Sequence, residues 1–425
     1  MKRVAIVEGI RSPYVKAGTD FKGLSSVDLG RSVLRELLER TAIDPSAIDE
    51  VIIGNVSPPV DSANPSRVIA LRAGLPKEIP AYTVQRNCAS GMQALTSAYT
   101  QIIAGESEVV VAGGVESMSQ IPFYFTPELQ EIITDFQRAR TLLQRIAILK
   151  RIRPAQLKPV IGVMLGLTDP VCGKNMGQTA EILAREFDIS RDEQDEFSLM
   201  SHQRAEAARE RLAEEIVSIM PTPKYNPVEQ DNGIRIGQTM EALGKLKPVF
   251  DRKYGTVTAG NASQLSDGAA MLLVMTEEKA KELGYEPLGF IKDFAYAGLD
   301  PARMGLGPVF ATQKLLNKTK VKFKDIQLME INEAFASQVI ACERAFASKE
   351  FVEKHFGTKR AIGKINRAIL NVNGGAIALG HPVGSTGARL VLTLLREMKR
   401  RDLNLGLASL CIGGGQGGAV LVERS

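Results

Sequence analysis

The stretch RNCASGMQALTSAYTQIIAG, residues 86–105, leads within two residues to EVVVAGGVE, residues 108–116. The first segment places apolar side chains at helical spacing, and the second is a β-branched run that ends in glycines. Working outward, VAIVEGI at 4–10 and IDEVIIGNV at 48–56 are strand-like, while DLGRSVLRELLERTAI at 28–43 is helix-like. Alternation of this kind predicts an α/β architecture with buried sheets.

A weak internal repeat relates the two ends of the chain. The order strand, polar turn, small-residue helix start, helix and strand occurs over residues 48–116 and again over 326–422. In this alignment Cys88 and His381 occupy matching places just ahead of a helix. Two similar halves packed together would bring both helix starts into one cleft. Chance likeness between α/β segments is the alternative.

The composition is that of a large globular protein. The 425 residues are 44% hydrophobic and 24% charged, which predicts two or three domain-sized units. Four widely separated cysteines predict reduced thiols, with no bound metal. A net charge of +5 fits an anionic ligand, but few aromatic residues argue against nucleic acid. MKRVAIVEGI lacks signal-peptide features and no apolar run would cross a bilayer, so we expect a cytoplasmic protein.

Cys88 is the first candidate for chemistry. It precedes Ala-Ser-Gly and a helical run, where unpaired N–H groups and the helix dipole favour a thiolate over a thiol. Small residues after it would let a substrate approach the sulfur. A buried, inert cysteine is the alternative, since free cysteine often behaves as a small hydrophobic residue.

His381 lies in NVNGGAIALGHPVGSTGAR, residues 371–389, where glycines indicate close backbone approach. Only three histidines exist, which makes His381 the best base for Cys88. His202, within the charged helix predicted at 190–216, is expected on the surface. A purely structural Gly-His-Pro turn is the alternative for His381.

Two further segments end strands with polar or glycine-rich turns. Cys411 ends an apolar strand and enters the glycine loop of CIGGGQGGA, which could form an oxyanion hole; Cys411 itself could move a proton at a substrate carbon. Asn332, in INEAFA at 331–336, follows a strand and could orient a water. Glu333 beside it could tune a neighbour or form a salt bridge.

Together and in this order, the motifs resemble those of the thiolase family along nearly the whole chain. The matching segments are NCASGMQAL, TVTAGNASQLSDGAA, INEAFA, GHPVGSTGAR and CIGGGQGGA. The resemblance implies the α/β thiolase fold, with two similar mixed-sheet halves in a layered α-β-α-β-α arrangement and an inserted loop domain. We expect an N-terminal half at 1–119 plus 250–280, a loop domain at 120–249 with a basic helical insert at 125–160, and a C-terminal half at 281–425.

The resemblance also implies an acyltransferase that uses coenzyme A as substrate and holds no permanent cofactor. Cys88 would carry the acyl group and His381 would activate it, while Cys411 would exchange the α-proton. Asn332, through a water, and His381 would stabilise the enolate, and the N–H groups of Cys88 and Gly413 would form the oxyanion hole. Similarity places further residues along the coenzyme A binding site: Ser263, Ala259, Phe250, Met176 and Phe335, with Arg235 near the nucleotide phosphates.

Two departures favour a degradative enzyme of fatty-acid β-oxidation that cleaves 3-ketoacyl-CoA of medium or long chain. Asn175 stands where short-chain biosynthetic thiolases carry a histidine. The insert resembles that of the thiolase subunit of trifunctional β-oxidation complexes, although relatives of that subunit often have histidine where Asn332 stands. The insert has no acidic residue from Phe136 to Leu167 but seven basic ones: Arg138, Arg140, Arg145, Lys150, Arg151, Arg153 and Lys158. It could be a solvated helix, or bind an anionic membrane or a hydratase/dehydrogenase subunit.

Three rival functions remain. A short-chain acetoacetyl-CoA thiolase would share every motif. A ketoacyl synthase would use a second histidine, where this chain offers Asn332 and Cys411. A non-catalytic acyl-CoA or lipid carrier on the same fold would be expected to lose a catalytic group. By resemblance, we expect a homodimer or a tetramer.

Overall fold

A computed structural model describes residues 2–223 and 225–424, and the chain divides into two compact units. The larger unit comprises Met1–Gln120 and Asp169–Ser425, and the smaller unit is Ile121–Thr168. Among the described residues, no helix combines the length and apolarity needed to span a bilayer.

The larger unit is built on one mixed sheet in the order β10-β11-β12-β9-β1-β8-β5-β3-β4, with β2 paired to β8. The strands are β1 (Val4–Arg11), β2 (Val15–Lys16), β3 (Glu50–Gly54), β4 (Ala81–Val84), β5 (Val109–Ser117), β8 (Ser266–Thr276), β9 (Gly289–Gly298), β10 (Leu328–Ile331), β11 (Leu405–Ile412) and β12 (Gln416–Glu423).

The sheet consists of two halves with the same pairing pattern. In the first half, β3 is parallel to β5, β5 is antiparallel to β8, and β8 is antiparallel to β1. In the second half, β10, β11, β12 and β9 repeat this series of pairings in the same order. A short antiparallel pairing of Val4–Ile6 with Gly289–Ile291 joins the halves. The internal repeat seen in the sequence is therefore a repeat of structure.

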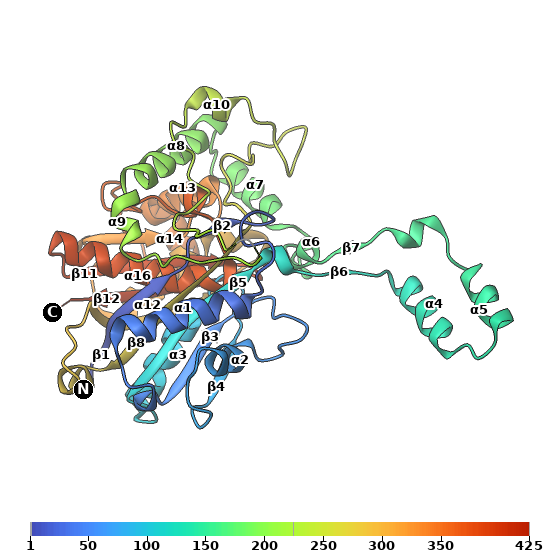
Figure 1. Cartoon of the computed structure of the whole chain (residues 1–425). Helices are drawn as coiled ribbons and strands as arrows, with labels where there is room; N and C mark the ends of the chain where they lie inside the picture. Colours follow the sequence, from blue (N-terminus) through green and yellow to red (C-terminus); the bar gives the residue numbers. More distant parts are fainter. Residues whose placement is uncertain (1, 224, 425) are drawn as a thin grey trace. The chain divides into compact units, whose positions relative to one another are not determined.

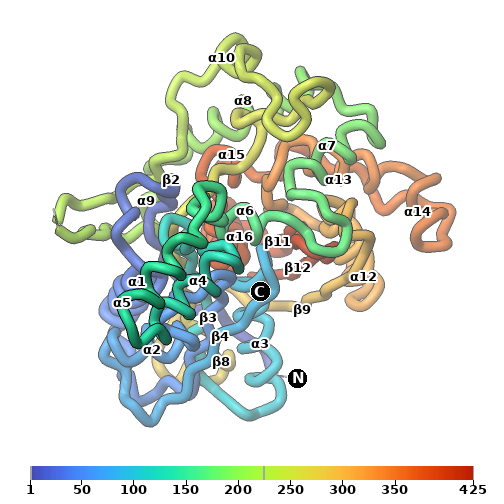
Figure 2. Tube along the Cα trace, turned by 90° about the vertical axis from the view of Figure 1, so that its right-hand side faces the viewer, coloured from blue at the N-terminus to red at the C-terminus, as the bar shows by residue number. Residues whose placement is uncertain are grey.

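Helices α1 (Ser26–Thr41), α2 (Pro65–Arg72), α3 (Ser90–Ala104), α12 (Gly307–Thr319), α13 (Ala336–Ala347) and α16 (Val383–Arg401) form the layers around the sheet halves. One hydrophobic cluster packs α1 and α2 on the first half, a second packs α12 and α13 on the other half, and the third encloses α3 and α16 between the two halves (Figures 1 and 2). The predicted α-β-α-β-α layering is confirmed.

The remaining helices of the larger unit are short or lie over the central layers. They are α7 (Met176–Glu186), α8 (Arg191–Ala207), α9 (Arg209–Ala213), α10 (Met240–Gly244), α11 (Glu277–Glu282), α14 (Lys349–Phe356) and α15 (Ala376–Leu379). One-turn 3-10 helices occur at Pro45–Ala47, Met118–Gln120 and Phe323–Asp325, and a longer one, kinked at Arg303, at Pro301–Leu306.

The central helices α3 and α16 touch at their N-terminal ends. A Cβ on Gly91 would lie 2.8 Å from the Gly384 carbonyl oxygen, and one on Gly387 would lie 2.4 Å from the Met92 nitrogen. These two glycines lack a Cβ where any other residue would separate the helices. The prediction that the two helix starts meet is therefore confirmed.

The smaller unit is a helical hairpin closed by a two-stranded ribbon. It contains β6 (Phe123–Tyr124), α4 (Pro127–Arg138), α5 (Leu142–Leu149), a 3-10 helix (Pro154–Leu157), β7 (Val160–Ile161) and α6 (Gly162–Gly166), with β6 antiparallel to β7. Thr126 caps α4, and Thr141 with Gln144 forms a capping box on α5, which explains why both helices begin where they do. Leu142, Leu143 and Leu149 of α5 are exposed.

His202 contradicts its predicted surface position. It lies on α8 and is 2% exposed, and its Nδ1 accepts a hydrogen bond from the Arg235 N–H at 3.2 Å. The predicted division into a loop domain at 120–249 and two flanking halves stays a prediction.

Candidate active site

Cys88 lies in the turn between β4 and α3, two residues before the first residue of the helix. Ser90 holds this turn, because its hydroxyl accepts from the Arg86 N–H at 2.9 Å and donates to the Asn87 carbonyl at 2.7 Å. Asn87 adopts a positive φ of 44°, which bends the chain ahead of the sulfur. The predicted position beside a helix start is confirmed.

The electrostatics of Cys88 differ from the sequence expectation. Burial raises the pKa of the Cys88 thiol, and the nearby charge of Glu116 raises it further. The backbone N–H groups of Gly413 and of Cys88 itself face the sulfur and oppose part of that rise. The expected net preference for a thiolate was wrong, because desolvation outweighs the donors at the helix start. A nucleophilic role for Cys88 would therefore require a base.

His381 lies just ahead of α16, on the other side of the α3–α16 contact. Its Nδ1 lies 2.7 Å from Thr386 Oγ1, and that hydroxyl donates to the Pro382 carbonyl at 3.0 Å. Since the hydroxyl proton is used there, Thr386 accepts from Nδ1–H, and Nε2 is left as the basic nitrogen. Burial, together with the charge of Arg389, lowers the pKa of His381 to about 3, so the ring is neutral and can accept a proton.

Asn332 follows β10 and faces the basic nitrogen of His381. Its Nδ2 donates to His381 Nε2 at 3.3 Å, while its backbone N–H donates to the Ser409 carbonyl at 2.9 Å. Asn332 is fully buried, and its Oδ1 has no hydrogen-bond partner among the described residues. An acceptor of this kind is usually satisfied by an ordered water or by a ligand.

Cys411 is the last residue but one of β11 and is 1% exposed. Burial raises the pKa of its thiol well above the ordinary value, and the negative charge of an ionised Cys88 is the next contributor. The two thiols are therefore coupled electrostatically. Past Cys411, the Gly413 carbonyl accepts from Asn87 Nδ2 at 2.7 Å, so the glycine loop is tied to the Cys88 turn.

Comparison with known proteins agrees with this arrangement. Family models described as the thiolase N-terminal domain and the thiolase C-terminal domain match residues 4–278 and 285–424. The chain belongs to the thiolase family.

Similar thiolases include proteins named for two different activities. A 3-ketoacyl-CoA thiolase of Pseudoalteromonas translucida is 41% identical over 100% of this chain and 97% of its own length. The structure of a Bacillus anthracis acetyl-CoA acetyltransferase has a TM-score of 0.87 at 41% identity, covering 100% of this chain and 99% of that one. Human mitochondrial 3-ketoacyl-CoA thiolase in complex with CoA has a TM-score of 0.85 at 35% identity, covering 100% and 98%.

Three of the six residues predicted to contact coenzyme A in this thiolase pack in one apolar cluster with Cys411. Met176, Phe250 and Phe335 belong to the same apolar cluster as that cysteine, and the rings of Phe250 and Phe335 meet edge to face at 6.1 Å. Ser263 donates its backbone N–H to the Ala334 carbonyl at 2.9 Å, which ties the TVTAGNAS segment to the INEAFA segment.

The other two predicted coenzyme A residues are exposed. Ala259 lies on the surface of the TVTAGNAS loop, and Arg235 lies over α8, where its backbone contacts His202. Asn175 caps α7 in a capping box with Gln178, so the residue that departs from short-chain thiolases has a structural role in starting this helix.

Glu333 forms hydrogen bonds with neutral donors, not the salt bridge considered from the sequence. It accepts from Ser201 Oγ at 2.6 Å, Asn371 Nδ2 at 2.8 Å and the Ile377 N–H at 3.3 Å. These bonds hold the glycine-rich segment that leads to His381. Sequence reasoning missed three supporting residues: Thr386, Asn87 and Glu116. The proximity of Thr386 and Asn87 to the motif residues was the available signal.

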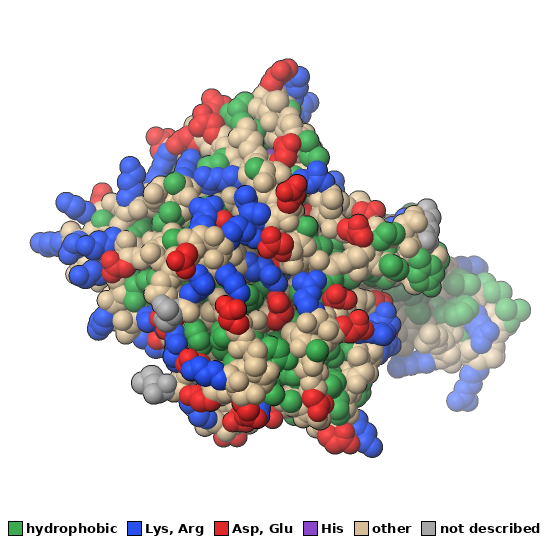
Figure 3. Space-filling model, turned by 60° about the vertical axis from the view of Figure 1, so that its left-hand side comes forward, with side chains coloured by type: hydrophobic (Ala, Val, Ile, Leu, Met, Phe, Trp, Pro, Cys, Tyr) green, Lys and Arg blue, Asp and Glu red, His purple; other side chains and the backbone are tan. Residues whose placement is uncertain are grey.

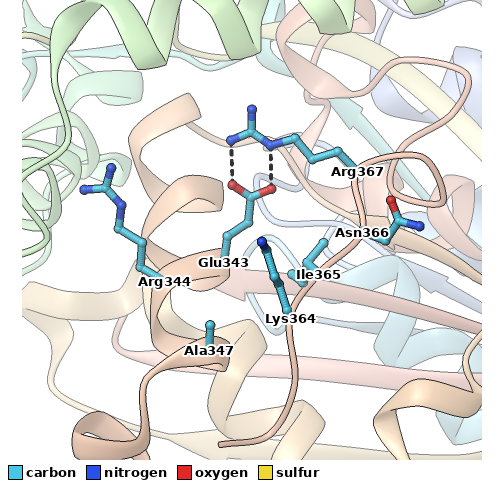
Figure 4. Close-up of a pocket in the computed structure, with 7 residues that line it drawn as sticks. All are labelled: Glu343, Arg344, Ala347, Lys364, Ile365, Asn366 and Arg367. Atoms are coloured by element: carbon cyan, nitrogen blue, oxygen red, sulfur yellow. Dashed lines mark hydrogen bonds and ion pairs between the residues drawn. The ribbon is translucent and has the colours of Figure 1, made fainter.

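The surface pocket drawn in Figure 4 is elsewhere on the molecule. Glu343 and Arg344 of α13 and the segment Lys364–Arg367 line it, and an ion pair between Glu343 and Arg367 crosses it. None of the predicted site residues lines this pocket. On the face shown in Figure 3, Lys and Arg side chains are interspersed with Asp and Glu and do not form a continuous basic track.

Proposed function

We propose that this thiolase is a 3-ketoacyl-CoA thiolase, which cleaves its substrate with CoA to acyl-CoA and acetyl-CoA. The observation that carries the proposal is the neutral His381, held by Thr386 and Asn332, across the α3–α16 contact from Cys88. Relatives about 40% identical over almost the whole chain, named 3-ketoacyl-CoA thiolase, support it. A non-catalytic carrier would have no need for this complete set of groups.

In the first half-reaction, Cys88 Sγ attacks the 3-keto carbon of the substrate while His381 Nε2 takes the thiol proton. The N–H groups of Cys88 and Gly413 face the sulfur and are suited to bind the oxyanion that forms. A preorganised donor in such a site contributes about 3–4 kcal/mol to transition-state stabilisation. The bond between C2 and C3 then breaks, which leaves an acyl group on Cys88 and the enolate of acetyl-CoA.

The enolate needs a donor for its oxygen and a proton for its carbon. His381 and a water on the unpartnered Oδ1 of Asn332 would stabilise the oxygen. Cys411 would protonate C2, a role that suits a thiol whose pKa is raised by burial and which therefore stays protonated. In the second half-reaction CoA gives its thiol proton to Cys411 and attacks the acyl-cysteine. The bond between the acyl carbon and Cys88 Sγ breaks, the Cys88 thiolate takes back the proton held by His381, and acyl-CoA departs. Two separable steps predict ping-pong kinetics.

Met176, Phe250 and Phe335 are proposed to line the pantetheine arm, since their apolar cluster leads to Cys411. Ser263 and Ala259 are proposed as further contacts of that arm. Arg235 is exposed and positively charged, which supports a contact with the nucleotide phosphates.

Medium- or long-chain 3-ketoacyl-CoA is the proposed substrate class, and acetoacetyl-CoA is the second candidate. The likeness to an acetyl-CoA acetyltransferase at 41% identity favours the latter. The test is kcat/KM for thiolysis as a function of acyl length, from acetoacetyl-CoA to long-chain 3-ketoacyl-CoA. We expect values at least tenfold higher for the longer chains, whereas a maximum at acetoacetyl-CoA would select the short-chain class. No turnover of any length would refute the thiolase proposal.

We also propose that the protein is a cytoplasmic homo-oligomer. Strand β4 ends the sheet order, so one of its edges is open to pair with a second copy. For the insert at 125–160 we propose contact with an anionic membrane surface, because exposed leucines of α5 accompany seven basic residues in a stretch, 136–167, that contains no acidic residue. Arg151 pairs with Glu131 and Asp135 of α4, so the proposal rests on the other six. A partner subunit is the alternative outcome of that test.

A further inference from the structure

Glu116 is a buried carboxylate that joins the segment after β3 to the start of the helix that follows His381. It lies near the end of β5 and is fully buried. Its oxygens accept from the N–H groups of Val56 at 3.0 Å, Ser57 at 3.0 Å and Gly384 at 3.1 Å, and from Asn55 Nδ2 at 3.0 Å. All four partners are neutral donors, and burial raises the pKa of Glu116 to about 7, so the side chain carries its negative charge above that pH.

The bond to Gly384 satisfies an orphan donor at the N-terminus of α16. The first N–H groups of a helix lack partners within the helix, and Pro382 at the cap position supplies no side-chain bond. A carboxylate at that end also interacts favourably with the helix dipole. Glu116 therefore caps α16 from the half of the protein that carries Cys88, across 268 residues of sequence.

The surroundings leave little freedom for this contact to shift. A Cβ on Gly384 would lie 2.4 Å from the Val115 carbonyl oxygen and 2.8 Å from Glu116 Oε2. A Cβ on Gly114 would lie 1.9 Å from the Gly384 carbonyl oxygen. The first turn of α16 thus packs directly on the end of β5, and its position depends on the groups that bind it there.

We propose that Glu116 is a positioning residue for the acyl transfer: it clamps the first turn of α16 to the Cys88 half of the protein and so holds His381 against the nucleophile. The role rests on the proposed function, and no substrate atom needs to touch Glu116. The negative charge of Glu116 also raises the pKa of the Cys88 thiol. It therefore opposes ionisation of Cys88 unless His381 accepts the proton.

Charge and position can be separated with two variants. Glu116→Gln removes the charge and turns an NH₂ group toward donors, whereas Glu116→Asp keeps the charge but withdraws the carboxylate by one methylene. We expect kcat for thiolysis to fall by about 100-fold in Glu116→Gln with KM within a few-fold, since small misplacements of catalytic groups cost about that much. Glu116→Asp should lose kcat as well.

The decisive measurement needs no substrate. The rate of Cys88 alkylation by iodoacetamide as a function of pH reports the thiol directly, and so stays informative even if thiolysis is not the reaction. In Glu116→Gln the midpoint of this profile should move to lower pH, and in Glu116→Asp it should stay near that of the wild type. A purely structural residue would change stability without moving the profile.

Glu397→Gln is the matched control, because Glu397 is a buried carboxylate at the far end of α16 that binds Asn373 and Arg401. It should lower stability but leave the alkylation profile in place. A Glu116→Gln protein with wild-type kcat and an unchanged profile would overturn the proposal. If that variant does not fold, Glu116→Asp with wild-type kcat would overturn it equally.

Discussion

Asn332 Nδ2 donates to His381 Nε2 over 3.3 Å, which joins the turn after β10 to the turn before α16. Both residues are buried, and both belong to the second repeat of the chain, one just after β10 and the other just before α16. The contact leaves the basic nitrogen of His381 facing a neutral amide, so nothing in the pair favours an imidazolium ion. In the proposed mechanism this neutral ring is the group that receives the Cys88 proton.

The first prediction concerns which sulfur carries the acyl group. Incubation with a 3-ketoacyl-CoA in the absence of free CoA should add the acyl mass to the peptide that contains Cys88, because that sulfur faces two backbone N–H donors. Cys88→Ala should lose thiolysis by several orders of magnitude while its unfolding midpoint stays close to the wild-type value. Mass spectrometry of the digested protein decides the matter. Label on Cys411 would exchange the two proposed roles.

The second prediction tests the residue that fixes the His381 tautomer. Thr386→Val keeps the shape of the side chain but leaves the buried Nδ1–H without an acceptor, which costs about 1–3 kcal/mol. Thermal unfolding should detect this loss, and kcat should drop by about tenfold or more as Nδ1 ceases to be the preferred site of the proton. Thr386→Ser retains the hydroxyl and is the control. Equal activity in the two variants would remove Thr386 from the mechanism.

The third prediction concerns stability and pH. Burial lowers the pKa of His381 to about 3, against an ordinary value of 6.5. In the unfolded chain His381 therefore binds a proton below about pH 6.5, whereas in the folded chain it does so only below about pH 3. The contribution of the neutral His381 to the free energy of unfolding is complete above pH 6.5. It is lost as the pH falls toward 3, by about 1.4 kcal/mol per pH unit.

Urea unfolding of the wild type and of His381→Asn at pH 7, 6 and 5 measures this effect. The wild type should lose stability more steeply than the variant as the pH falls. His202→Asn is the control, because His202 is a second buried imidazole whose pKa is lowered by burial to about 4. This variant should also reduce the loss of stability at low pH. Unlike His381→Asn, it should keep its activity. Parallel curves for wild type and His381→Asn would contradict a buried neutral imidazole.

Local patterns in the sequence were enough to predict the α/β class and the places of the candidate residues at element boundaries, and the resemblance to thiolases supplied the order of the layers. Cys88, Asn332, His381 and Cys411 stand at ends of strands or starts of helices, and those boundaries are marked by glycines, proline and changes of periodicity. The repeat was also visible, because both halves use the same order of strand, turn and helix.

Properties that depend on distant contacts could not be predicted in this way. Glu116 ends an ordinary-looking strand, and no local signal reveals that the Gly384 N–H approaches it from 268 residues away. The burial of His202 depends in the same way on a backbone contact from Arg235. The raised pKa of Cys88 follows from desolvation by the whole fold, whereas the sequence displays the helix start alone.

The last prediction concerns the smaller unit, Ile121–Thr168. Leu142 and Leu143 of α5 are 73% and 81% exposed, and basic side chains surround them in sequence. Apolar side chains that enter the headgroup region, with arginines that bind lipid phosphates, would give binding that weakens with salt. Deletion of residues 128–158 should therefore abolish co-sedimentation with vesicles of anionic phospholipid while kcat for acetoacetyl-CoA changes less than threefold. Because α4 and α5 belong to a separate compact unit, the deletion leaves the core of the larger unit intact.

Leu142→Ser with Leu143→Ser is the milder variant, and it should weaken vesicle binding without any change in thermal unfolding of the larger unit. Failure of the full-length protein to co-sediment with anionic vesicles at low salt would refute membrane contact. A partner subunit would then be the proposed ligand of this surface.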